Sequence, residues 1–160
     1  MKDQKVALVT GSSNGIGYES SLMLARNGFQ AFATMRNLSK RFGIETVAST
    51  EGLPIHVVEL GVTGDKSVND AIQQIFSMAG RIDVLINNAG YALFGTLEDL
   101  SADELKTQYE TNLLGIVRVT QAVFPTIRNQ RSGIIVNVSA AGGRFGIPGI
   151  SGYASSKFAV

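Results

Sequence analysis

The chain of 160 residues has the length of one domain, and 44% hydrophobic residues with 18 glycines and 3 prolines indicate a tightly turned α/β protein, not a disordered or fibrous one. A net charge of +1 without a long basic run argues against nucleic acid as the main ligand. The absence of cysteine excludes disulfides and thiolate-bound metals and suits a reducing compartment, so we expect no metal site.

No apolar stretch approaches the roughly 20 residues that a membrane helix needs, so we expect no membrane partner. The first apolar run already begins near Lys5, which leaves no room for a signal peptide ahead of it. We therefore expect a cytoplasmic protein.

Residues 6–10 form a short continuous apolar run, which predicts a strand buried on both faces of a parallel sheet. A glycine-rich segment follows and leads into a helix. The first glycine allows a tight turn, the second lets a phosphate approach the backbone, and the third permits close helix–strand packing. The alternative is an ordinary strand-to-helix turn, but this context favours phosphate binding. The predicted phosphate-binding residues are Gly11, Ser12, Ser13, Asn14, Gly15, Ile16 and Gly17.

The next predicted strand, residues 31–34, is followed by Arg36 where dinucleotide folds usually place an acid on the adenosine ribose. Lys40 and Arg41 come shortly after. A guanidinium can bind a 2′-phosphate with two hydrogen bonds, whereas a carboxylate repels it. The pattern favours NADP(H) over NAD(H), unless Arg36 is merely a solvated surface residue.

Residues 55–60 and 82–86 are further predicted strands, and Asp65 between them is a candidate helix cap. The only histidine, His56, has no nearby ligand set or triad, and we interpret it as structural. The segment 87–90, Asn-Asn-Ala-Gly, either locks neighbouring strand ends and lines a cofactor cleft or forms a simple Asn-Gly turn.

A helical period places seven residues on one face of a long helix spanning 105–127. They are Leu105, Tyr109, Asn112, Ile116, Thr120, Val123 and Ile127. Burying the Asn112 amide without a partner costs about 1–3 kcal/mol. Asn112 therefore either caps a local irregularity in the helix or holds water in a site.

The last predicted strand, residues 134–138, delivers Ser139 at its carboxyl end, the usual place for ligand sites in such sheets. Tyr153 and Lys157 follow, four residues apart and hence on one helix face. A fixed ammonium stabilises a phenolate, which brings a tyrosine toward useful acid–base range. By itself this spacing also fits a half-buried tyrosine beside a solvated lysine. The unbroken alternation of strands and helices predicts a doubly wound parallel α/β sheet of the Rossmann type.

These pieces occur in one order: Thr10-Gly11-x3-Gly15-x-Gly17, the segment 87–90, Asn112, Ser139 and Tyr153-x3-Lys157. Together they resemble the short-chain dehydrogenase/reductase family along the whole chain. Residues 33–37 and 88–91 are most similar to its NADP-preferring steroid and retinoid reductases. The resemblance implies interconversion of a small-molecule carbonyl and a secondary alcohol, with NADP as cofactor.

In the family's roles, Tyr153 is the general acid, Lys157 holds the nicotinamide ribose, Ser139 polarises the substrate carbonyl and Asn112 positions a relay water. The cofactor residues implied by the resemblance, beyond the glycine segment, are Arg36, Val62, Asn88, Ala89, Gly90, Tyr153 and Lys157. One departure is Gly61, where the family commonly has an acid beside the adenine.

The resemblance also implies a fold that continues beyond Val160, so we expect five strands of a larger sheet and one NAD(P)-binding domain over 1–160, incomplete at its carboxyl end. The strand 134–138 then has an unpaired edge. The full protein is expected to form a homo-oligomer. The alternative function for these residues is a nucleotide-binding module without turnover.

Overall fold

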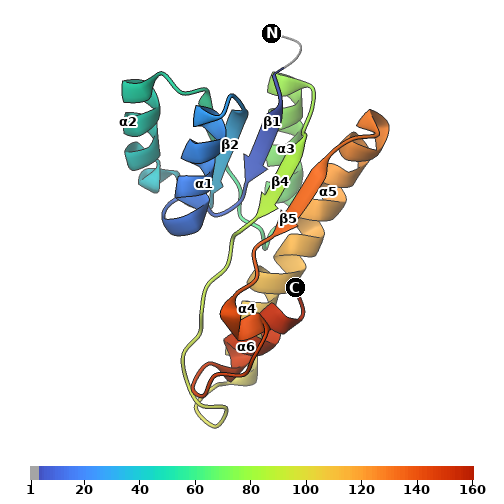
Figure 1. The fold of residues 1–160 in the computed structure, drawn as a ribbon. Helices are drawn as coiled ribbons and strands as arrows, with labels where there is room; N and C mark the ends of the chain where they lie inside the picture. The colour runs from blue at the N-terminus through green and yellow to red at the C-terminus, as the bar shows by residue number, and fades with distance from the viewer. Residues whose placement is uncertain (1–3) are drawn as a thin grey trace.

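Five parallel strands form one sheet in the order β3-β2-β1-β4-β5 in the computed structural model, which describes residues 4–160 (Figure 1). Residues 1–3 of the predicted domain lie outside the described part. The strands are β1 (Val6–Val9), β2 (Gln30–Met35), β3 (Ile55–Glu59), β4 (Val84–Asn87) and β5 (Ile134–Asn137). The doubly wound parallel sheet expected from the sequence is confirmed.

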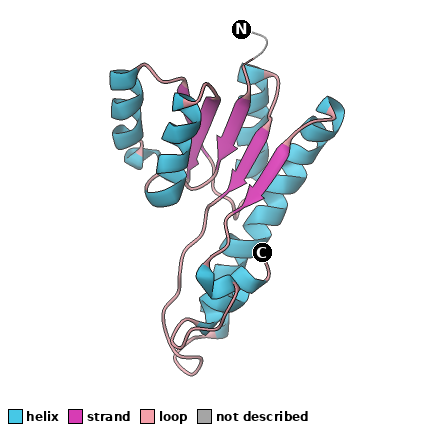
Figure 2. Cartoon of the chain, in the orientation of Figure 1, coloured by secondary structure: helices cyan, strands magenta, loops and turns pink. Residues whose placement is uncertain are grey.

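Helices cover both faces of the sheet (Figure 2). The pair α1 (Gly15–Arg26) and α2 (Phe42–Glu51) packs on one face, and α3 (Asp65–Ala79) and α5 (Gly115–Gln130) pack on the other. The short helices α4 (Ala102–Tyr109) and α6 (Ser151–Phe158) lie beyond the carboxyl ends of the strands, where Figure 1 shows them together. Within residues 4–160, no helix is long and apolar enough to cross a membrane.

The core is densest around β1, whose four residues are all fully buried. Apolar side chains from α3 and α5 fill one face of the sheet, and a smaller cluster beneath α1 and α2 fills the other. Burial on both faces explains why β1 is a continuous apolar run. At one edge of the sheet, Ile134 and Val136 of β5 are 60% and 42% exposed.

The predicted helix over 105–127 is interrupted by a π-helical turn, η2 (Glu110–Leu114), between α4 and α5. The irregularity that Asn112 suggested is therefore present, because Asn112 is the middle residue of η2. A π turn adds one residue to the helical repeat and commonly marks a functional site. The expectation that Asp65 caps a helix is wrong: Gly64 is the N-cap of α3 and Asp65 bonds Arg118 instead.

Candidate cofactor and active site

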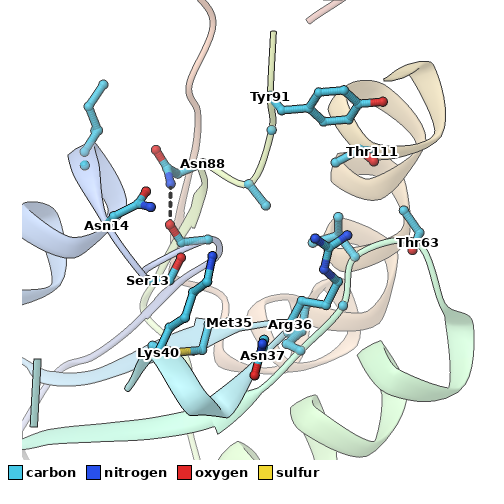
Figure 3. A pocket seen from close by; sticks show the side chains of 18 of the residues that line it. Ser13, Asn14, Met35, Arg36, Asn37, Lys40, Thr63, Asn88, Tyr91 and Thr111 are labelled. Atoms are coloured by element: carbon cyan, nitrogen blue, oxygen red, sulfur yellow. Dashed lines mark hydrogen bonds between the residues drawn. The ribbon is translucent and has the colours of Figure 1, made fainter. Parts of the chain in front are cut away.

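A cavity of about 600 Å³ opens at the carboxyl ends of β1 and β4, where the strand order reverses. This switch point is where open α/β sheets bind ligands. Four loops that follow strands, together with the helix α4–η2, line the cavity (Figure 3). The lining residues are Gly11, Ser13, Asn14, Gly15, Ile16, Met35, Arg36, Asn37, Lys40, Leu60, Gly61, Val62, Thr63, Asn88, Ala89, Gly90, Tyr91, Thr107 and Thr111.

The backbone of the glycine segment adopts conformations and close contacts that a larger residue would not allow. Gly11 and Gly15 have φ of +70° and +58°, in the left-handed region that favours glycine. At Gly17 an added Cβ would lie 2.4 Å from Asn88 Nδ2 and 2.5 Å from the Gly11 carbonyl oxygen. The side chain of the N-cap residue Asn14 caps no N–H of α1, so the first turn keeps donors available for an anion.

Within the glycine segment, two of the residues predicted to bind the cofactor, Ser12 and Gly17, do not line the cavity. Ser12 is completely buried, and its hydroxyl donates to the Val9 carbonyl at 3.0 Å. Ser21 Oγ donates to Ser12 Oγ at 3.1 Å and to the Gly17 carbonyl at 2.7 Å. Their side of the loop faces the core, so they shape the loop from inside.

Basic side chains approach the cavity from the loop after β2. In Figure 3, Arg36 and Lys40 project toward the cavity from one side, and Tyr91 and Thr111 lie on the opposite wall. Within the described chain, no carboxylate belongs to the cavity lining. This end of the cavity therefore carries positive charge without a compensating acid, which suits an anionic group.

The two adjacent amides of segment 87–90 have separate roles. Asn87 Nδ2 donates to Asn137 Oδ1 at 2.9 Å and to Thr120 Oγ1 at 3.0 Å, which ties the ends of β4 and β5 to α5. Asn88 Nδ2 donates to the carbonyls of Thr10 and Gly11 at 2.9 and 3.1 Å. The amides thus lock neighbouring strand ends, and only Asn88 also lines the cavity.

Tyr153 and Lys157 lie on one side of α6, with Lys157 Nζ 6.0 Å from the centroid of the Tyr153 ring. Lys157 is only 5% exposed, and Nζ donates to the Val138 carbonyl at 2.8 Å. Burial lowers the pKa of Lys157 from its ordinary value. Ser139 Oγ donates to the Lys157 carbonyl at 2.9 Å, so the end of β5 is fastened to α6.

Asn112 is fully buried, and its amide is bonded to the chain on both sides. Oδ1 accepts the Tyr91 N–H at 3.0 Å, and Nδ2 donates to the Tyr91 carbonyl and to Ser156 Oγ, both at 3.0 Å. Ser156 Oγ in turn donates to the Tyr153 carbonyl at 2.8 Å. The π turn thereby connects the loop after β4 to the backbone of the tyrosine, and a relay water at Asn112 stays a prediction.

Gly90 separates the cavity from these four residues. A Cβ on Gly90 would lie 3.0 Å from Asn112 Oδ1 and 3.5 Å from Lys157 Nζ. Asn112 and Lys157 therefore lie immediately beyond Gly90. Ser139 bonds the Lys157 carbonyl, and the Tyr153 ring lies across α6 from Lys157 Nζ. None of these four residues belongs to the cavity lining.

Several residues that line the cavity, from the loops and from the helix α4–η2, were not predicted from the sequence. Missed members of the lining are Met35, Asn37, Leu60, Thr63, Thr107 and Thr111. The four-residue spacing of Thr107 and Thr111 was an available signal, because such residues share a helix face. Gln108 was also missed: it is fully buried, and its Nε2 donates to the Tyr91 carbonyl at 3.2 Å beside Asn112.

A doubly wound parallel sheet with a glycine-lined cavity at its switch point defines an α/β protein of the Rossmann type. The profile of the short chain dehydrogenase family matches residues 5–160. The chain therefore belongs to the short-chain dehydrogenase family.

Among curated relatives, the chain is 42% identical to oxidoreductase BOA17 of Botryotinia fuckeliana, over 98% of this chain and 56% of the relative. It is 40% identical to bovine (Bos taurus) retinol dehydrogenase 8, over 98% of this chain and 51% of that protein. The solved structure of actinorhodin polyketide ketoreductase with NADPH superposes with a TM-score of 0.95 at 28% identity, over 99% of this chain and 62% of that one. The chain spans about half the length of the curated relatives it matches.

Proposed function

We propose that the protein is an NADP(H)-dependent oxidoreductase that interconverts a small-molecule carbonyl and a secondary alcohol by hydride transfer. The observation that carries this proposal is the position of Lys157 immediately beyond Gly90, at the end of the glycine-lined cavity, with the Tyr153 ring 6.0 Å from Lys157 Nζ. The similarity to a retinol dehydrogenase and to a ketoreductase solved with NADPH supports the same chemistry.

The residues present fit a dinucleotide phosphate. The turn at Gly11 and Gly15 leaves open backbone where side chains would intrude, and the first turn of α1 offers N–H donors to a pyrophosphate. Arg36 and Lys40 would hold the 2′-phosphate at the basic end, and Lys157 would hold the nicotinamide ribose. When bound, the cofactor supplies or accepts the hydride.

Side chains of the protein transfer the proton that accompanies the hydride. In the reductive direction, the Tyr153 hydroxyl donates its proton to the carbonyl oxygen, and in the oxidative direction the phenolate accepts it from the alcohol. The Lys157 ammonium is held by the Val138 carbonyl and lies 6.0 Å from the centroid of the Tyr153 ring, so its positive charge favours the phenolate that forms when Tyr153 gives up its proton. Ser139 is exposed at the end of β5, where its hydroxyl can exchange the Lys157 carbonyl for a substrate oxygen and so polarise it.

The test is NADPH oxidation by the full-length protein with a panel of ketones and aldehydes, and NADP reduction with the matching alcohols. We expect carbonyl-dependent oxidation that follows substrate concentration and disappears without the carbonyl compound. A protein that binds NADPH but turns over no member of a broad panel would contradict the proposal.

The second candidate function is nucleotide binding without turnover by residues 1–160 taken alone. The observation that favours it is the edge strand β5, where Ile134 and Val136 are 60% and 42% exposed. An apolar edge with unpaired backbone groups invites pairing with another chain. The eight-residue helix α6 (Ser151–Phe158), which carries the proposed catalytic pair, is too short to be stable without packing.

Size-exclusion chromatography and an NADPH-oxidation assay on residues 1–160 test the second candidate. We expect weak NADPH binding, association of chains and little reductase activity, whereas we propose that the full-length protein forms a defined homo-oligomer. A monomer of residues 1–160 with ordinary turnover would refute the second candidate.

A further inference from the structure

One wall of the cavity is held by a charged side chain that does not itself reach the cavity. Gly61, Val62 and Thr63 form this wall after β3. Behind them, Arg118 Nη1 donates to the Val62 carbonyl at 2.8 Å from the first turns of α5. Arg118 therefore joins the loop after β3 to a helix that follows it by more than fifty residues.

The guanidinium of Arg118 also bonds two carboxylates. Nη2 donates to Glu110 Oε1 at 2.6 Å, and Nε donates to Asp65 Oδ1. The Asp65 side chain is 81% exposed, so this contact contributes little, whereas the side chains of Glu110 and Arg118 are 36% and 21% exposed. The contacts that matter most thus connect the wall at Val62 to Glu110, the first residue of the π turn.

Close packing between the wall and α5 prevents the wall from moving toward the helix. A Cβ on Gly115 would lie 2.7 Å from Val62 Cγ2, so the helix touches the wall where it has no side chain. The C=O of Val62 and the N–H of Thr63 belong to one trans peptide and point in opposite directions. Because the carbonyl is turned toward Arg118, the Thr63 N–H is turned away from α5. That N–H has no hydrogen-bond partner within residues 4–160.

We propose that Arg118 is a positioning residue for the cofactor: it fixes the peptide between Val62 and Thr63 so that the wall can receive the adenosine half of NADP(H). The inference rests on the proposed function, because it assumes that a dinucleotide occupies the cavity. At Gly61 this chain offers no side chain to the cavity, so recognition at this wall depends on a correctly placed backbone. A guanidinium suits this task, since its planar fork directs separate N–H groups at separate acceptors.

The adenosine half is common to NADPH, NADH and AMP, which separates Arg118 from residues that read the 2′-phosphate. In the full-length protein, Arg118→Met should weaken binding of all three ligands by the same factor, about tenfold, the size expected for a lost charge-assisted hydrogen bond. Calorimetric titration with each ligand measures the factors. The matched control is Arg128→Met, which removes the same charge from the exposed last turn of α5 and should leave all three affinities unchanged.

A second variant separates positioning from simple ion pairing. Glu110→Gln keeps the Arg118 hydrogen bond to the Val62 carbonyl while removing the charge of its main partner, so AMP affinity should stay within about twofold of wild type. Arg118→Lys is the milder change if the methionine variant does not fold. A single ammonium facing Glu110 forfeits the directed bond to Val62, and AMP affinity should again fall.

Unchanged AMP affinity in Arg118→Met, or in Arg118→Lys if only that variant folds, would overturn the inference. A loss of affinity for NADPH alone would also overturn it, as would a loss of AMP affinity in Glu110→Gln equal to that in the Arg118 variant. A wild-type protein that binds none of the three nucleotides would overturn the proposed function itself. Normal wild-type binding that Arg118→Met leaves intact would overturn only the role of Arg118.

Discussion

The two halves of the sheet are built differently. Every residue of the central strand β1 is buried, and beside it the glycine loop and Asn88 pack so closely that a methyl group added at Gly17 would overlap two atoms. Around β5 the strand is largely exposed, and two hydrogen bonds fasten its carboxyl end to α6, from Ser139 to the Lys157 carbonyl and from Lys157 to the Val138 carbonyl. In the proposed function, nucleotide binding would depend on backbone shape and dense packing, whereas catalysis would depend on a few side chains at a less buried edge. Substitutions in the first half should change binding and folding, and substitutions in the second should change turnover.

The largest effect is expected for Tyr153→Phe, which removes one hydroxyl from the less buried half. Losing a positioned general acid typically costs about 10²–10⁴-fold in rate, while the ring and its packing remain. Turnover of the full-length variant should fall by that order, and its dissociation constant for NADPH should barely change. A variant that retains most of its turnover would show that another group transfers the proton.

Gly17→Ala should lower both NADPH affinity and stability, because Gly17 lies in the densely packed half of the sheet. Alanine is normally favoured over glycine in a helix, but here its Cβ would lie 2.5 Å from the Gly11 carbonyl oxygen. Overpacking of this kind costs about 1–3 kcal/mol, and the displaced loop should bind NADPH poorly.

Urea unfolding and NADPH titration measure both effects of Gly17→Ala. The control is Gly43→Ala in α2, where the nearest atom to the added Cβ would be 3.9 Å away; it should leave NADPH binding unchanged and should not lower stability. If Gly17→Ala behaves like this control, the close approach of α1 to Asn88 does not matter.

Substitution of Asp83, which lies at the amino end of the sheet and far from the cavity, tests a contribution to stability alone. Its carboxylate accepts the Val6 N–H at 2.8 Å and two hydrogen bonds from Arg81. Burial raises the pKa of Asp83, but these hydrogen bonds outweigh burial, and the net pKa lies below the ordinary 3.8. Asp83→Asn should therefore lower the free energy of unfolding at neutral pH by about 1–3 kcal/mol.

The sign of the pH dependence follows from that lowered pKa. The contribution of Asp83 is fully present above pH 3.8 and is lost as the pH falls through the lower value of the folded state. Wild type and Asp83→Asn should therefore converge in stability in acid, as thermal unfolding across pH will show. Asp70→Asn, in an exposed pair with Lys66, is the control and should change little. A constant gap between wild type and Asp83→Asn at every pH would contradict the assignment.

The smallest effect is expected for Arg36→Ala, because Arg36 is exposed and water screens its contacts. NADPH affinity should fall by roughly tenfold or less, and NADH affinity should change little. Arg41→Ala is the matched control, since Arg41 follows in the same basic run but lies outside the cavity lining. Equal losses for both cofactors would show that Arg36 does not read the 2′-phosphate.

The fold was predictable from the sequence because each buried strand is an apolar run, and the glycine segment because its spacing reflects a backbone requirement. The π turn was not predictable in detail, since one extra residue hardly disturbs the apolar period between Leu105 and Ile127. The inward orientation of Ser12 escaped as well, because a small polar residue in a loop gives no sign of which way it points. Arg118 was missed because its partner Val62 lies far back along the chain and the contact uses a backbone carbonyl.

The most direct test of the account is titration of the wild-type full-length protein with NADPH, followed by fluorescence, with 2′,5′-ADP as competitor. We predict saturable binding at one site per chain and full displacement by 2′,5′-ADP. This nucleotide carries the phosphate groups that the glycine loop and the basic end of the cavity would receive. Absence of saturable binding, or binding that 2′,5′-ADP cannot displace, would contradict it.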